Sequence, residues 1–121
     1  MEKKETPVGS NAEYRAKLEQ WMETDKPYLN PDFRLLDLRQ VLPLNRTYLS
    51  QLINAEYGCN FYQFATNYRI EEAKHLMTEH PEMTMEDVAN QCGFSSARSF
   101  YRAFDREVDM TPKEWLATQS E

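Results

Sequence analysis

Three arginines recur at every fourth position near the end of the chain: Arg98, Arg102 and Arg106. On a helix this spacing places one guanidinium group per turn along a single stripe. Guanidinium groups bind phosphate oxygens and can donate two hydrogen bonds to O6 and N7 of guanine. The stripe therefore suits a nucleic-acid surface, and it also suits a solvated helix face. Residues 45–121 hold seven Lys and Arg against twelve Asp and Glu, so the positive charge of this half is concentrated here.

A second polar set, made of Arg46, Thr47, Ser50 and Gln51, lies about fifty residues earlier. Arginine can bind guanine, glutamine can pair with N6 and N7 of adenine, and the threonine methyl group can contact thymine. These side chains fit the base edges of a major groove, and they fit plain solvent equally well.

The side chains that could support catalysis or hold a metal are few. Two cysteines without a CxxC motif, Cys59 and Cys92, and two histidines, His75 and His80, form neither a disulfide framework nor a metal-ligand set. Cys92 falls at a core position of the pattern described below. We therefore expect no enzyme, no catalytic residue, no metal site and no cofactor.

The composition fits one compact soluble domain, or two very small domains that share a core. The chain has 121 residues, 40% of them hydrophobic, and a net charge of −6, which argues against a broadly basic surface that coats nucleic acid. No apolar run reaches the roughly 18 residues that a membrane span needs, and the N-terminus lacks a signal peptide. The predicted location is the cytoplasm.

The hydrophobic spacing predicts an all-α fold of seven helices, because glycines and clustered β-branched residues are scarce. Residues 1–10 look like a tail or linker remnant, and a domain should cover 11–121. The expected parts are a first helix-turn-helix subdomain at about 11–59, a long connecting helix at 60–80 and a second subdomain at 81–121. Asn45, Asn60 and Ser96 are the expected N-caps, and Thr111 with Glu114 has the spacing of a capping box.

The chain contains an internal repeat. A shift of 50 residues superposes Leu38 on Val88, and a shift of 51 superposes Asn45 on Ser96. The shift of 50 also superposes Leu42 on Cys92. The shift of 51 also superposes further inward positions and a further cap, namely Leu49 on Phe100, Ile53 on Phe104 and Asn60 on Thr111. Two copies of one helix-turn-helix unit explain this register.

Two stretches now carry a family resemblance. LRQVLPLNRTYLSQLINAEYGCNFYQFATNYRIEEAKHLM and MEDVANQCGFSSARSFYRAFDREVDMTPKEW resemble the two motifs of the DNA-binding domain of AraC/XylS-type transcription regulators, from about Leu35 to Leu116. The resemblance implies seven helices, with two recognition helices that enter the major groove of DNA. The function implied for this chain is regulation of transcription.

The resemblance also implies the site residues. The candidates for base contacts are Arg46, Thr47, Ser50, Gln51, Arg98, Tyr101 and Arg102. Helix starts bind phosphate through exposed N–H groups, so Asn45, Ser95 and Ser96 are candidates for phosphate contacts. Arg106, the last arginine of the stripe, is a further candidate for a phosphate contact through its charge. Tyr48 and Ser99 are weaker candidates, and Arg69 on the connecting helix is expected to form a structural ion pair.

Two residues depart from the family pattern. Arg39 replaces a small residue whose counterpart in the second unit is Ala89, so its side chain must turn outward or pair with an acid such as Asp37. Asp109 replaces a glycine and should adopt a left-handed conformation at a cost of about 1 kcal/mol.

We therefore expect sequence-specific binding of double-stranded DNA, with recognition helices in successive major grooves about 34 Å apart. RNA polymerase and an upstream sensor or effector domain are further candidate partners, and no small-molecule site is expected in this stretch. The domain could form the cytoplasmic end of a membrane-anchored regulator. The alternative is a helical protein-interaction module that does not recognise DNA.

Overall fold

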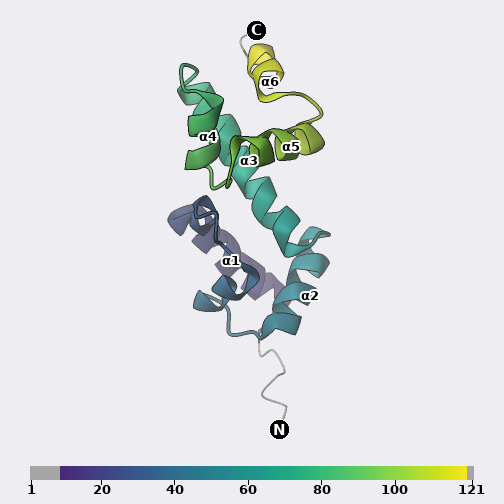
Figure 1. Cartoon of the computed structure of the whole chain (residues 1–121). Helices are drawn as coiled ribbons and strands as arrows, with labels where there is room; N and C mark the ends of the chain where they lie inside the picture. Colours follow the sequence, from purple (N-terminus) through teal and green to yellow (C-terminus); the bar gives the residue numbers. More distant parts are fainter. Residues whose placement is uncertain (1–8, 120–121) are drawn as a thin grey trace. The chain divides into compact units, whose positions relative to one another are not determined.

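The computed structural model of the chain describes residues 9–119, and within this range it contains helices and no strands (Figure 1). The elements in chain order are α1 (Asn11–Asp25), η2 (Pro27–Leu29), η3 (Leu35–Gln40), α2 (Arg46–Tyr57), α3 (Phe61–Glu79), α4 (Met85–Gln91), α5 (Ala97–Val108) and α6 (Pro112–Thr118). The predicted all-α fold is confirmed. Its seven helices are the six α-helices and the 3₁₀ helix η3, while η2 is an additional single turn.

The predicted N-caps begin the helices. Asn45, Ser96 and Thr111 each accept a hydrogen bond from the backbone N–H three residues later, at 3.0 to 3.1 Å. Glu114 completes the capping box by accepting from the backbone N–H of Thr111 at 3.0 Å. These bonds satisfy backbone donors that the first helical turn leaves free, and so they fix where α2, α5 and α6 start.

A further cap begins α1 at the edge of the expected tail. The Ser10 hydroxyl accepts from the backbone N–H of Glu13, and the Glu13 carboxylate accepts from the backbone N–H of Ser10, both at 3.1 Å. Ser10 is thus the N-cap that directly precedes α1. Residues 1–8 of the expected tail lie outside the described part of the chain.

The second predicted helix forms as the 3₁₀ helix η3. The backbone N–H of Asp37 donates to the carbonyl of Arg34, and that of Val41 donates to Leu38, which are the tighter i to i+3 bonds of this helix type. Leu38 is buried and Arg39 is exposed, whereas both positions of the equivalent pair on α4 are buried. The outward direction of Arg39 was one of the two predicted outcomes, and it leaves the core of the first unit free of a charge.

The described chain forms two compact units. The first holds the chain up to Pro27 together with Asp32–Phe64, and the second holds Tyr28–Pro31 together with the residues from Ala65 onward. The long helix α3 is divided between the two units after Phe64. The division differs from the expected boundaries at 59 and 81, which treat α3 as a separate connector.

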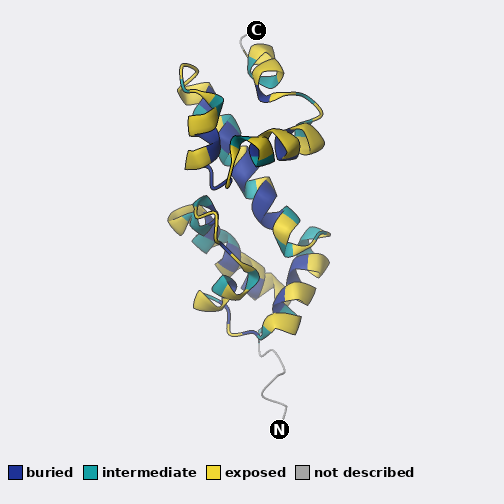
Figure 2. Cartoon of the chain, viewed as in Figure 1, coloured by how far each residue is buried: buried dark blue, intermediate teal, exposed yellow. Residues whose placement is uncertain are grey.

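The first unit buries one face each of α1 and α2 (Figure 2). Its fully buried side chains recur three to four residues apart along both helices, as an amphipathic pattern requires. They are Leu18, Met22, Leu49 and Ile53, together with Leu38 and Leu42 of the η3 segment, each at most 1% exposed. An aromatic cluster adjoins this core, with the Phe33 ring centroid 6.0 Å from Trp21 and 5.1 Å from Phe61.

The second unit has its own core where α3, α4 and α5 meet (Figure 2). Its members are Ile70, Ala73, Met77, Val88, Ala89, Cys92, Phe94, Phe100, Ala103 and Phe104. Phe100 lies 5.3 Å from Phe94 and 5.7 Å from Phe104 between ring centroids. Trp115 of α6 contacts this cluster through the edge of Phe104, at 6.1 Å.

The structure confirms the internal repeat. Leu49 and Ile53 of α2 are completely buried, and so are Phe100 and Phe104 at the equivalent positions of α5. The N-caps also coincide, as shown above. Two copies of one packing scheme therefore present two helices, α2 and α5, that turn equivalent faces to solvent.

Candidate nucleic-acid interface

The exposed face of α2 carries the first set of predicted base contacts. Arg46, Thr47, Ser50 and Gln51 are all exposed, and they line an open concavity of about 660 Å³. Two further α2 residues, Asn54 and Ala55, complete its lining. The structure thus brings the four predicted residues of this helix together on one face.

The exposed face of α5 carries the predicted arginine stripe. Arg98, Arg102 and Arg106 are exposed, while Phe100 and Phe104 on the opposite face are completely buried. The hydrophobic side of α5 thereby fixes its rotation about its own axis. The stripe faces solvent along the whole helix.

The three arginines differ in their own contacts. Nε of Arg106 donates to the Glu107 carboxylate at 3.3 Å, so a neighbouring acid offsets part of its charge. Within residues 9–119, the Arg98 and Arg102 guanidinium groups have neither a hydrogen bond nor an ion pair. Unpaired and exposed donors of this kind are available to an external acceptor.

The repeat places the two polar sets at equivalent positions. The register that aligns Asn45 with Ser96 also aligns Thr47 with Arg98 and Gln51 with Arg102. The two members of each pair lie on different helices, at the same number of residues after the N-cap of their helix. The two units thus present different chemistry from the same positions of one scaffold.

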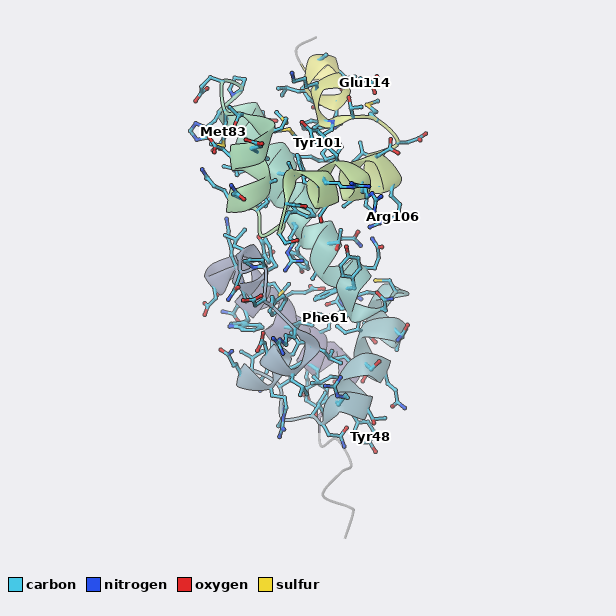
Figure 3. All side chains as sticks on the ribbon, viewed as in Figure 1. Tyr48, Phe61, Met83, Tyr101, Arg106 and Glu114 are labelled. Carbon is cyan, nitrogen blue, oxygen red and sulfur yellow. The ribbon has the colours of Figure 1, made fainter. Side chains whose placement is uncertain are left out.

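Tyr101 has different surroundings from the arginines. It lines a largely apolar groove of about 990 Å³ together with Met83, Met85 and Leu116. Figure 3 shows Tyr101 on the side of α5 that faces α6. Glu82, Glu86 and Lys113 also line this groove. The sequence analysis did not predict this groove.

Three of the four predicted phosphate contacts, Asn45, Ser95 and Ser96, lie at helix starts, and the fourth, Arg106, lies in the last turn of α5. The side-chain oxygens of Asn45 and Ser96 are occupied as N-caps, so their remaining polar capacity and the nearby backbone N–H groups would meet an anion. Ser96 also donates to the Ser99 hydroxyl at 3.1 Å. Ser95 is exposed beside this cap.

Cys92, one of the two cysteines, is a core residue as predicted. Cys92 is completely buried, and burial raises the pKa of its thiol to about 12, with a smaller contribution from the negative charge of Glu72. A thiol in that state is protonated at neutral pH and a poor nucleophile. Among residues 9–119, no three acidic, cysteine or histidine side chains gather as metal ligands, and no helix is long and apolar enough to cross a membrane.

Comparison with known protein families identifies the family of this chain. A family model described as a helix-turn-helix domain matches residues 38–118, which is most of the chain. The chain belongs to the AraC-type helix-turn-helix family. This membership confirms the prediction of a domain for DNA binding and transcription regulation.

Individual relatives of this chain are also described as regulators. An uncharacterized HTH-type transcriptional regulator of Staphylococcus aureus (strain COL) is 34% identical over 88 residues, which are 73% of this chain and 12% of that protein. The chain thus spans about an eighth of the length of this relative. The C-terminal domain of the two-component response regulator yesN from Fusobacterium nucleatum is 28% identical, with a TM-score of 0.73 over 88% of this chain and 99% of that domain.

A third comparison concerns the fold alone. The DNA-binding domain of the global transcriptional factor AdpA, solved in complex with a target DNA, has a TM-score of 0.70 and 20% identity. The match covers 89% of this chain and 90% of that domain.

Proposed function

We propose that this AraC-type domain reads a bipartite DNA site by placing α2 and α5 in successive major grooves, about 34 Å apart on one face of the duplex. The observation that carries the proposal is the equivalence of the two exposed helix faces. Thr47 and Gln51 on α2 occupy the same positions as Arg98 and Arg102 on α5, and all four side chains are exposed.

Each predicted side chain has a chemical role in this proposal. Arg98 and Arg102 donate to guanine O6 and N7, Gln51 pairs with adenine, and the Thr47 methyl group contacts thymine. Arg46, Ser50 and Tyr101 add hydrogen bonds at the edges of these contacts. Because the two helices carry different residues, a single chain should recognise an asymmetric site.

The remaining candidates position the domain on the backbone. Asn45, Ser95 and Ser96 lie at the starts of α2 and α5, where backbone N–H groups and the positive end of the helix dipole favour phosphate. Arg106 adds a charge near the end of α5. With a net charge of −6 the chain should bind nonspecific DNA weakly, so base contacts must supply more of the selection.

Selection from a pool of randomised duplexes, read by sequencing at two salt concentrations, tests the proposal. A bipartite sequence with two halves about 10 base pairs apart should be enriched at both salt concentrations. A helical protein-interaction module would enrich no sequence, and that outcome would overturn the proposal.

We also propose that RNA polymerase docks in the groove between α4, α5 and α6. Met83, Met85 and Leu116 contribute apolar lining to the groove, and Glu82 and Glu86 add two negative charges against the one positive charge of Lys113. Phosphate oxygens are repelled by such a border, whereas a basic amphipathic helix of a protein subunit fits it.

The paired variants Met83→Ala and Glu82→Lys test the polymerase contact. Both should reduce transcription activated in vitro and leave binding to the selected duplex at wild-type strength or above. Asn90→Lys, an exposed site on α4 outside the groove lining, is the control. Equal loss in the control, or loss of duplex binding in step with transcription, would remove the groove from the mechanism.

We further propose that this chain is the DNA-binding part of a larger regulator whose sensor or effector domain lies elsewhere in the polypeptide. The short span of this chain on its relative supports that arrangement. On this proposal the domain has no catalytic activity, needs no cofactor and acts in the cytoplasm, where its DNA is. Attachment to a membrane-anchored sensor is compatible with that location.

A further inference from the structure

A short segment of the chain crosses from one unit to the other. Tyr28–Pro31 belongs to the second unit, although the residues on both sides of it belong to the first. The chain therefore passes between the units three times, once within α3 and once at each end of this crossing segment. A connecting helix alone would need one passage.

Arg69 of α3 holds the crossing segment through its backbone. Its Nε donates to the carbonyl oxygen of Tyr28 at 2.7 Å, and its Nη2 donates to that of Asn30 at 3.1 Å. Arg69 is only 7% exposed, so its permanent charge depends on such partners. A planar guanidinium group reaches two carbonyls of one segment at once, which the single ammonium group of lysine does less well.

Two other residues of the second unit fit closely around the segment. Tyr28 is 4% exposed, and its ring centroid lies 5.3 Å from that of Tyr68. At Gly93, a Cβ atom would fall 2.2 Å from the Tyr28 carbonyl oxygen and 3.1 Å from the carbonyl carbon of Leu29. Only a residue without a side chain allows this approach. The backbone at Gly93, just after α4, therefore packs directly against the backbone of the crossing segment.

We propose that the crossing segment is a second tether between the two units and that Arg69 is its positioning residue. The ends of the segment lead directly to α1 and η3, so fixing it restrains the whole first unit relative to the second. A chain joined through α3 alone has more freedom. The inference rests on the proposed bipartite reading, because the restraint serves to hold α2 and α5 at the spacing of one site.

A measurement without DNA tests the restraint itself. Spin labels are placed at exposed positions of the two units by Glu23→Cys on α1 and Asn90→Cys on α4 in a Cys59→Ser background, where the buried Cys92 stays unlabelled. Pulsed electron paramagnetic resonance then gives the distribution of distances between the two spin labels. We expect a narrow distribution for this labelled parent, a broad one after Arg69→Ala, and partial recovery of the narrow one with Arg69→Lys.

Two further variants keep the test decisive. Tyr68→Ala removes the ring that contacts Tyr28, so it should broaden the distribution even if Arg69→Ala fails to fold. Met77→Ala destabilises the core of the second unit without touching the segment, and its distribution should stay narrow. A distribution already broad in the parent, or unchanged by both Arg69→Ala and Tyr68→Ala, would overturn the tether.

A second arm measures how the restraint affects binding. Arg69→Ala should lose about tenfold in affinity for the selected two-part duplex, keep its affinity for a duplex with only one half, and tolerate altered spacing better than the wild type. An equal loss on the single half would mean that Arg69 only stabilises the fold. If the wild-type chain selects no sequence, the proposed function fails, while the distance distributions still decide whether the tether exists.

Discussion

Gly58 and Asp109 end the two equivalent helices in the same left-handed conformation, with φ values of 69° and 63°. Each donates its backbone N–H to the carbonyl four residues earlier, Gly58 to Asn54 at 3.0 Å and Asp109 to Asp105 at 2.8 Å. The repeat thus preserves the backbone of the cap while its residue changes. Asp109 has to adopt a conformation that is strained for any residue with a side chain.

The first prediction is that Asp109→Gly stabilises the chain. The substitution removes the strain of the left-handed aspartate and should raise the free energy of unfolding by about 0.5 to 1 kcal/mol. Urea denaturation followed by circular dichroism measures the change. Gly58→Ala is the matched control and should destabilise, because no atom lies within 4 Å of the added Cβ and only the backbone strain counts. Lower stability of Asp109→Gly would contradict the interpretation.

The second prediction concerns Thr66 on α3. Its hydroxyl is completely buried and has no hydrogen-bond partner among the described residues. Thr66→Val replaces this hydroxyl with a methyl group and should raise the free energy of unfolding by about 1 kcal/mol. Thr78→Val on the same helix is the control, because that exposed hydroxyl donates to the Lys74 carbonyl at 2.8 Å and should change stability little. Equal effects at both positions would count against a penalty from the unpaired group.

The third prediction follows from a contact between α1 and α2. The Tyr57 hydroxyl donates to the Glu19 carboxylate at 2.8 Å, and this bond, aided by Arg15, holds the pKa of Glu19 below its ordinary value of 4.5. A lowered pKa adds stability above the pKa of the unfolded state, and that stability is lost as the pH falls through the folded-state pKa. The wild type should therefore lose more stability than Tyr57→Phe between pH 7 and pH 3.

The difference between the two proteins should stay below about 1 kcal/mol, because Glu19 is 38% exposed in its side chain and solvent screens the interaction. The phenylalanine keeps the ring contacts with Arg15 and Phe64, so only the hydroxyl bond is lost. Urea titrations of both proteins at the two pH values give the comparison. Parallel pH dependence would remove Tyr57 as the cause of the lowered pKa.

The fourth prediction concerns thiol reactivity. Because burial raises the pKa of Cys92 to about 12, a thiol reagent at pH 8 should modify Cys59 alone in the folded chain. Cys92 should react at the rate of global unfolding, which addition of urea would raise. Mass spectrometry of the alkylated peptides distinguishes the two sites. Simultaneous modification of both cysteines in native buffer would contradict the buried position.

Local signals in the sequence were sufficient for much of the fold. Asn45 and Thr111 indicate where their helices begin, because an N-cap bonds to the backbone three positions later. The spacing of Ser10 and Glu13 indicates the start of α1 in the same way. The strain at Asp109 was also predictable from one position. The exposed arginines of α5 followed from the buried phenylalanines on its other face.

Contacts between distant residues were not predictable in this way. The expected structural role of Arg69 includes hydrogen bonds from its guanidinium group to two backbone carbonyls, 41 and 39 residues earlier in the chain, which no local pattern indicates. The hydrophobic pattern likewise predicted a helix at η3 without distinguishing 3₁₀ from α geometry, because both geometries bury residues three to four positions apart. The roles of the side chains on α2 and α5 toward DNA stay a prediction.

The last prediction separates readers of bases from a binder of the backbone. Arg102→Ala should lose about 1 to 3 kcal/mol on the selected duplex and relax base preference in one half of the site. Gln51→Ala, at the equivalent position of α2, should relax preference in the other half. Arg106→Ala should weaken selected and random duplexes by the same factor, because a phosphate contact does not distinguish sequences, and it should lower the dependence of affinity on salt. Binding titrations with base-substituted duplexes at two salt concentrations measure all three. If Arg102→Ala and Gln51→Ala weaken every duplex uniformly, or relax the same half, the two helices do not read separate parts of one site.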